Sequence, residues 1–65
     1  MTFDEHLDYL KSLPENWWKS GDNVLLVGRT LHYMGVIGTA EQAFDFIEKP
    51  RKWQREIDIL IEEYK

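Results

Sequence analysis

The stretch VLLVGRTLHYMGVIGTAEQAFDFIEKP, from Val24 to Pro50, decides the fold, because it is the most apolar part of the chain and holds three of its four glycines. It can turn at Gly28 as a β-hairpin over residues 24–34, or between Gly35 and Gly38 as two helices. The residues flanking Gly28 do not alternate apolar and polar side chains, as a half-exposed hairpin would. At helical spacing the apolar residues form one stripe, so we favour two helices: Val24, Val27, Leu31 and Met34.

The helical interpretation requires a structural reason for glycine at position 28. Glycine inside a helix costs about 1 kcal/mol relative to alanine, so a packing reason is needed, and the close approach of a neighbouring helix supplies one. Thr39 followed by Gln42 predicts a capping box at the start of that neighbour. Its predicted buried stripe has four members: Ala40, Ala43, Phe44 and Ile47.

Helices are also expected on either side of this hairpin. Thr2 with Glu5 predicts a capping box for the first, which Pro14 should end, with Phe3, Leu7 and Leu10 on its apolar stripe. The last begins near Pro50, and its stripe is Trp53, Ile57, Leu60, Ile61 and Tyr64. The sequence therefore predicts a small all-α, four-helix domain with a central helical hairpin, whose first helix is covered on both sides. The alternative is an α+β fold with a β-hairpin at 24–34.

Size and composition limit the classes of function. The 65 residues, 7.8 kDa in mass, carry a net charge of −4 and no cysteine, which excludes thiol catalysis and disulfides. So small a domain has a thin margin of stability, so that a partner surface would help to complete it. No apolar run approaches the roughly 20 residues of a membrane span, and the acidic N-terminus is unlike a secretory signal. We predict one domain, residues 1–65, in the cytoplasm and away from membranes.

No catalytic or metal-binding motif stands out. His6 and His32 are far apart in sequence, and neither has a second histidine four residues on. The serines and threonines have no base beside them in any motif, and the glycines fit no phosphate-binding spacing. We therefore predict a non-enzyme that needs no cofactor and no metal.

The spacing within residues 24–50 resembles a single tetratricopeptide repeat, a helix–turn–helix unit. Gly28, Gly35, Ala40 and Phe44 stand at the family's small, turn, small and large aromatic positions, and Ile37 at the apolar position that opens the second helix. The early aromatic positions are Val24 and Leu31 here, Ile47 replaces a usual alanine, and Pro50 comes two residues early. The resemblance implies a close contact between Gly28 and Ala40. It also implies that the first helix faces the partner with Asp22, Leu25, Arg29, His32 and Tyr33.

A helical wheel supports the same face, since Leu25, Arg29, His32 and Tyr33 lie away from the Val24, Val27 and Leu31 stripe. Tryptophan is enriched in binding hot spots, so the pair Trp17 and Trp18 is either part of the small core or part of a contact surface. The predicted partner-binding residues are Trp17, Trp18, Leu25, Arg29, His32 and Tyr33. The predicted function is a small adaptor or inhibitor that binds another protein, of a kind found in phages and plasmids, and self-association is compatible with it.

The alternative function is nucleic-acid binding through a basic cluster around one tryptophan: Lys49, Arg51, Lys52, Trp53 and Arg55. Cations at a helix start are disfavoured by the helix dipole, which suggests either a use or offsetting pairs. Base stacking on Trp53 or on an arginine would be the use, and Lys52 could pair with Glu48 or Glu56 along the helix. The acidic net charge favours a solvated face over nucleic-acid contact.

Overall fold

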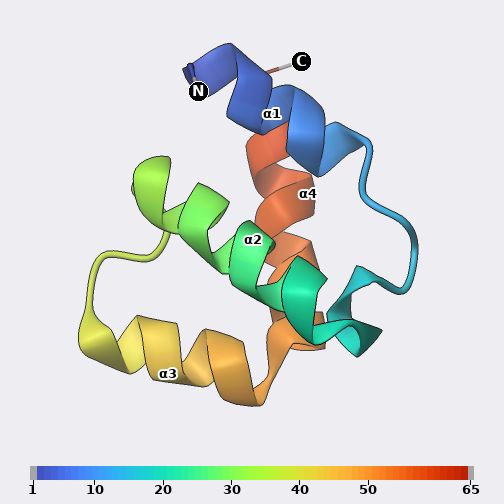
Figure 1. Cartoon of the computed structure of the whole chain (residues 1–65). Coiled ribbons are helices and arrows are strands. Elements are labelled where there is room, and N and C mark those ends of the chain that lie inside the picture. The colour runs from blue at the N-terminus through green and yellow to red at the C-terminus, as the bar shows by residue number, and fades with distance from the viewer. Residues whose placement is uncertain (1, 65) are drawn as a thin grey trace.

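The computed structural model describes residues 2–64, and over that range the chain is all-α. Its elements are α1 (Phe3–Lys11), the 3-10 helix η1 (Trp17–Lys19), α2 (Gly21–Tyr33), α3 (Ala40–Glu48), the 3-10 helix η2 (Pro50–Trp53) and α4 (Gln54–Glu63) (Figure 1). The predicted four-helix domain is confirmed. The α+β alternative is wrong, because residues 24–33 lie inside α2 and residues 2–64 contain no strand.

The turn that separates α2 from α3 comes at Gly35. This residue has a φ of 83°, in the left-handed region that glycine enters without strain. The backbone N–H groups of Val36 and Ile37 then donate to the carbonyl of Leu31, which closes the end of α2. Thr39 and Gln42 form the predicted capping box at the start of α3. Local hydrogen bonds therefore define both the end of α2 and the start of α3.

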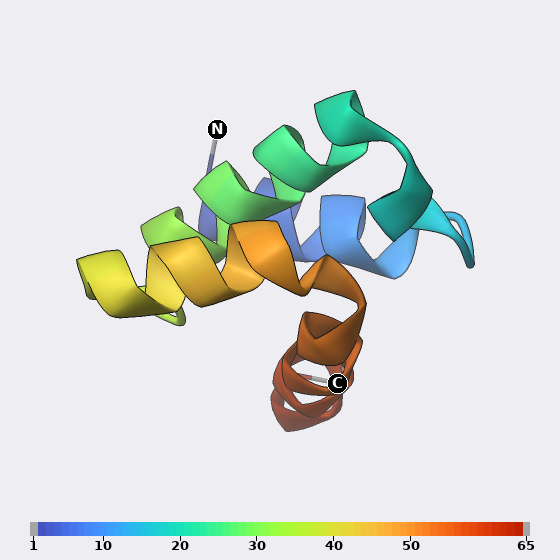
Figure 2. The ribbon, with the colours of Figure 1, turned by 90° about the horizontal axis from the view of Figure 1, so that it is seen from below.

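The helices cross rather than stack in parallel. In Figure 1, α2 passes in front of α4, α1 lies against the far end of α4, and α3 lies at the opposite end of the molecule. Seen from below in Figure 2, α2 and α3 run beside one another while α4 projects away from them. The rings of Phe3 and Tyr64 meet edge to face, with centroids 5.0 Å apart, so the first and last helices are joined near the chain ends.

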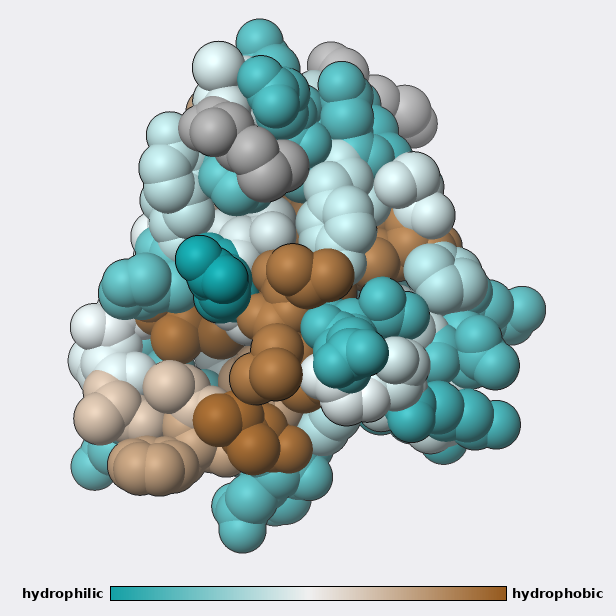
Figure 3. Space-filling model, viewed as in Figure 1, coloured by the Kyte–Doolittle hydropathy of each residue, from teal (hydrophilic) through white to brown (hydrophobic). Residues whose placement is uncertain are grey.

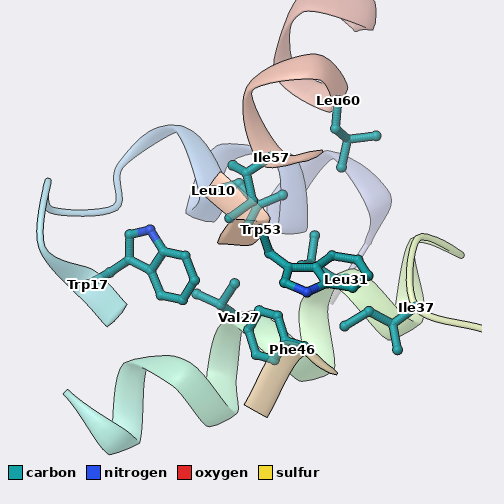
Figure 4. Close-up of a cluster of buried hydrophobic side chains, with 9 residues drawn as sticks. All are labelled: Leu10, Trp17, Val27, Leu31, Ile37, Phe46, Trp53, Ile57 and Leu60. Atoms are coloured by element: carbon teal, nitrogen blue, oxygen red, sulfur yellow. The ribbon is translucent and has the colours of Figure 1, made fainter. Parts of the chain in front are cut away.

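The core is unusually aromatic for a chain of this size. Phe46 lies between two tryptophans: its ring centroid is 6.0 Å from that of Trp17, nearly parallel to it, and 6.0 Å from that of Trp53, edge to face. Such ring pairs add to the stabilisation that comes from burial alone. The buried cluster drawn in Figure 4 is Leu10, Trp17, Val27, Leu31, Ile37, Phe46, Trp53, Ile57 and Leu60.

The predicted stripes of α1, α2 and α4 are largely confirmed, although Tyr64 of the last stripe is 50% exposed. The predicted stripe of α3 is wrong. Phe46 is the residue that α3 buries, whereas Phe44 and Ile47 are exposed. The physical reason lies across the interface at Gly28: a Cβ there would lie 3.0 Å from Cε2 of Phe46. Gly28 thus has the packing role that was predicted, but the atoms against it belong to Phe46 and not to Ala40.

The second helix is covered on one side only. Val27 and Leu31 are completely buried, as predicted, and face the core. Leu25 and Leu26, on the other side, are exposed, so the prediction that α2 is covered on both sides is wrong. Three flanking helices of nine or ten residues are too short to surround it. An apolar face is left at the surface.

Candidate functional site

A groove of about 850 Å³ runs between α2 and α3, and His6 of α1 also lines it. Figure 3 shows apolar surface gathered over these two helices. The groove brings together four of the six predicted partner-binding residues: Leu25, Arg29, His32 and Tyr33. Its remaining lining is His6, Val24, Gly28, Ile37, Ala43, Phe46 and Ile47. The floor is therefore made by core residues, and the walls by side chains that protrude.

Helical spacing explains how α2 builds one wall. Leu25, Arg29 and Tyr33 are four residues apart, so they follow one another along a single face of the helix. Ile47 of α3 forms the opposite wall, because Phe46 beside it points into the core. Sequence reasoning assigned Ile47 to the core and left His6 out of the site. The run Phe44 to Ile47 carries three large apolar side chains, which cannot all face inwards on one short helix. This run therefore indicated that at least one of the three side chains would lie at the surface.

Each of the two histidines that line the groove contacts another of its lining residues. Nδ1 of His32 lies 3.0 Å from the carbonyl oxygen of Ile37. Since a carbonyl only accepts, Nδ1 carries the proton and donates it, which ties the last turn of α2 to the loop before α3. The ring of His6 lies against that of Tyr33, with centroids 4.3 Å apart. His6 Nδ1 is buried and has no hydrogen-bond partner within residues 2–64.

The charge of the groove differs in sign from that of the chain. The net charge of the protein is −4, yet none of the described residues that line the groove is Asp or Glu, whereas Arg29 is among them. Arg29 is exposed and forms no ion pair with any carboxylate of residues 2–64. The groove therefore presents an uncompensated cation beside apolar walls.

Trp17 is a core residue, and its predicted place on the contact surface is wrong. Its side chain is only 1% exposed, and its indole N–H donates to Oε1 of Gln54 at 2.6 Å. Trp18, the next residue, points in a different direction and does not line the groove. The guanidinium of Arg51 and the ammonium of Lys19 lie 5.2 and 5.3 Å from its ring centroid. Trp17 thus completes the core, whereas Trp18 is partly buried against the edge of the core and has two cations beside its ring.

The structure divides the predicted basic cluster. Trp53 is buried, and its indole N–H donates to Oδ2 of Asp45 at 3.0 Å, so its predicted role as a stacking surface is wrong. Lys52 lies 3.3 Å from the same oxygen, rather than pairing with Glu48 or Glu56. These two donors lower the pKa of Asp45 below its ordinary value. Lys49 and Arg55 are exposed, but no aromatic ring of this cluster is free to stack between them.

No helix within residues 2–64 has both the length and the apolar character needed to cross a bilayer. In the same range, no three His, Asp or Glu side chains come together in a way that could hold a metal ion. No protein-family model, curated protein or solved structure matches the chain. The groove between α2 and α3 is therefore the structural feature on which a functional proposal can be based.

Proposed function

We propose that the protein is a non-enzymatic binding module, an adaptor or an inhibitor, that receives another protein in the groove between α2 and α3. One observation carries the proposal: Leu25, Tyr33 and Ile47, from two helices, protrude into one groove while remaining 63%, 57% and 60% exposed. Large apolar side chains gathered at a concave surface are typical of binding sites. Apolar residues that are exposed one at a time, away from any groove, would not indicate a binding site.

The size of the apolar walls bears on the strength of the contact. Full burial of one large apolar side chain contributes about 1.5–3 kcal/mol. About three fifths of each of these three side chains is still exposed, so together they supply roughly 3–5 kcal/mol on binding. Association itself costs about 4–15 kcal/mol. The walls alone therefore support weak binding at most, and polar contacts at Arg29 and His32 are needed to reach the roughly micromolar affinity expected of a reversible adaptor.

The composition of the groove also supports a binding role over a catalytic one. Its polar side chains are Arg29, the two imidazoles and the phenol of Tyr33, and its lining contains no serine, threonine or carboxylate that could form a nucleophile–base pair with them. The cytoplasm remains the proposed location, since a chain without cysteine suits a reducing compartment.

Two matched pairs of substitutions test the proposal. Leu25 lines the groove and the adjacent Leu26 does not, although it is 49% exposed. Ile47 lines it, whereas Ile59 of α4, 52% exposed, does not. The four serine variants are used as baits in native host cells, and co-purified proteins are quantified by mass spectrometry. We expect a partner that is retained by Leu26→Ser and Ile59→Ser and lost with Leu25→Ser and Ile47→Ser.

The same experiment can contradict the proposal. Equal recovery with all four baits would place the contact elsewhere on the surface. With Arg55→Glu added as a fifth bait, loss of the partner with that variant but not with Leu25→Ser would favour the basic residues near α4 and hence the nucleic-acid alternative. Sedimentation over a range of protein concentrations identifies a second copy of the chain as the partner, if the groove variants abolish a dimer that the control variants keep.

A further inference from the structure

We infer that the occupant of the groove is an amphipathic helix of a partner protein, with a carboxylate placed beside its apolar stripe. This inference rests on the proposed function of the groove and adds the chemistry of the partner. Its two parts, the charge and the helical form, come from separate features of the structure.

The charge follows from Arg29. This residue stands in a groove without carboxylates, on a protein that is otherwise acidic, and it has no ion-pair partner within residues 2–64. Within residues 2–64 Lys52 is the one Lys or Arg with an ion pair, to Asp45, so Arg29 is set apart by its place among the apolar walls of the groove and not by the lack of a partner. A cation among apolar walls becomes partly desolvated when a partner covers it, and this is costly unless the partner brings the opposite charge. His32 and His6 add no negative charge, so the complementary side chain must be supplied by the partner.

The helical form follows from the walls. The described residues contain no strand, so a partner has no free sheet edge to extend. The groove lies between two packed helices, and a third helix fits such a surface by placing its side chains between theirs. The apolar surface also continues beyond the groove to Phe44, which is 69% exposed but does not line it. A ligand confined to the groove would leave Phe44 uncovered, whereas a helix lying over α3 would cover it.

A second copy of this chain satisfies these conditions less well. Its candidate helix is α4, where exposed Ile59 stands among acidic residues. Seating α4 of one copy in the groove of another leaves a free groove at the end of each assembly unless the contact is reciprocal about a twofold axis. Two chains that each carry a charge of −4 also repel one another.

The test is a selection from a displayed library of helical peptides of about 16 residues, roughly 24 Å in length, which is longer than the 13-residue α2 that forms one wall of the groove. Peptides are selected on the wild-type protein and counter-selected on Leu25→Ser. Dissociation constants of the survivors are then measured for the wild-type protein and for four variants: Leu25→Ser, Leu26→Ser, Arg29→Glu and Arg55→Glu.

We expect survivors to carry Asp or Glu next to an apolar stripe. Their affinity should fall about tenfold or more with Arg29→Glu and stay within about twofold with Arg55→Glu, because a charge-reversed contact repels where the original attracted. Replacing the selected carboxylate with lysine should restore binding to Arg29→Glu. This rescue separates a direct contact from a general change in net charge.

The two hypotheses fail differently. Survivors that depend on Leu25 but lack a carboxylate, or that bind Arg29→Glu as well as the wild-type protein, overturn the inference and leave the proposed function standing. A selection in which no peptide distinguishes Leu25→Ser from Leu26→Ser counts against the groove as a binding site, and against the proposed function with it. Survivors that keep their affinity when proline replaces a residue in their middle, where it would break a helix, overturn the helical form alone.

Discussion

Replacing Trp17 with alanine should remove most of the stability of this protein, whereas the same change at Trp18 should remove little. The two residues are adjacent and chemically identical, so any difference between the variants comes from their surroundings. Trp17 is fully buried against Phe46 and donates a hydrogen bond to Gln54. Trp18 is only partly buried, with Arg51 beside its ring.

The structure sets the size of the expected difference. Truncating a buried tryptophan to alanine costs about 3–5 kcal/mol through lost burial and the cavity that remains. A domain of 65 residues has a total stability of roughly 3–10 kcal/mol at 0.05–0.15 kcal/mol per residue, so Trp17→Ala should remove more than half of that stability at the middle of the two ranges. Trp18→Ala loses partial burial and an exposed cation–π contact, and should cost about 1 kcal/mol. Trp17→Phe keeps an aromatic ring beside Phe46 and should cost about 1–3 kcal/mol.

The assay is urea unfolding followed by circular dichroism at about 222 nm, a wavelength chosen because it reports helix content and avoids the fluorescence of the tryptophans being changed. The expected order of free energies of unfolding is wild type, Trp18→Ala, Trp17→Phe, Trp17→Ala, from highest to lowest. Equal losses for the two alanine variants, or a greater loss at Trp18, would refute the assignment of Trp17 to the core and Trp18 to the surface.

Three further substitutions test local features by the same unfolding assay. Gly35→Ala should cost about 1 kcal/mol because Gly35 has a φ of 83°, whereas Gly21→Ala, with no atom near its added methyl group, should change the free energy by less than about 0.5 kcal/mol. Thr39→Ala removes the hydroxyl of the capping box and should cost about 1 kcal/mol; no change would mean that the box does not hold the start of α3. The pKa of Asp45 is lowered by hydrogen bonds from Trp53 and a neighbouring lysine. The ionised carboxylate therefore contributes fully to the folding stability above its ordinary pKa of 3.8, and this contribution is lost as the pH falls through the lowered pKa of the folded protein. Asp45→Asn should therefore reduce the loss of stability between about pH 5 and pH 2, and an unchanged pH profile would contradict this.

The sequence was sufficient to predict the fold because each element carries its own local signals. A helix-compatible stripe, a glycine at the turn and a capping box at residues 39–42 all point to the same hairpin, and the structure contains each of them. Agreement between local signals is what lets one sequence specify one fold. Periodicity likewise identified Val27, Leu31, Ile57 and Leu60 as core residues.

The burial of α3 and of the tryptophans could not be predicted in the same way. Phe44, Phe46 and Ile47 are all large and apolar, so the stripe that faces inwards is chosen by the shape of the opposing helix and not by composition. That shape is the gap left by Gly28, which admits the ring of Phe46. The tryptophan pair posed the same problem, since nothing local distinguishes Trp17 from Trp18.

The candidate site was predicted in part for a related reason. One wall lies on a single helix, α2, where helical spacing alone collects Leu25, Arg29 and Tyr33. The opposite wall and the α1 contribution depend on how separate elements pack, so Ile47 and His6 could not be assigned to the groove beforehand. The place of Ile47 there follows from the choice of Phe46 as the buried residue of α3, whereas His6 lies there because its ring packs against that of Tyr33.

The most direct test of the groove as the contact surface is a photo-crosslinking experiment in native host cells. A photoreactive phenylalanine derivative is placed at position 25 in one variant and at position 26 in another, both on exposed parts of α2, and illuminated cells are analysed for crosslinked products. The account predicts a discrete heavier product from position 25 that is absent from position 26 and that disappears when Ile47→Ser is added. Products of equal intensity from both positions, or a product from position 26 alone, would contradict it.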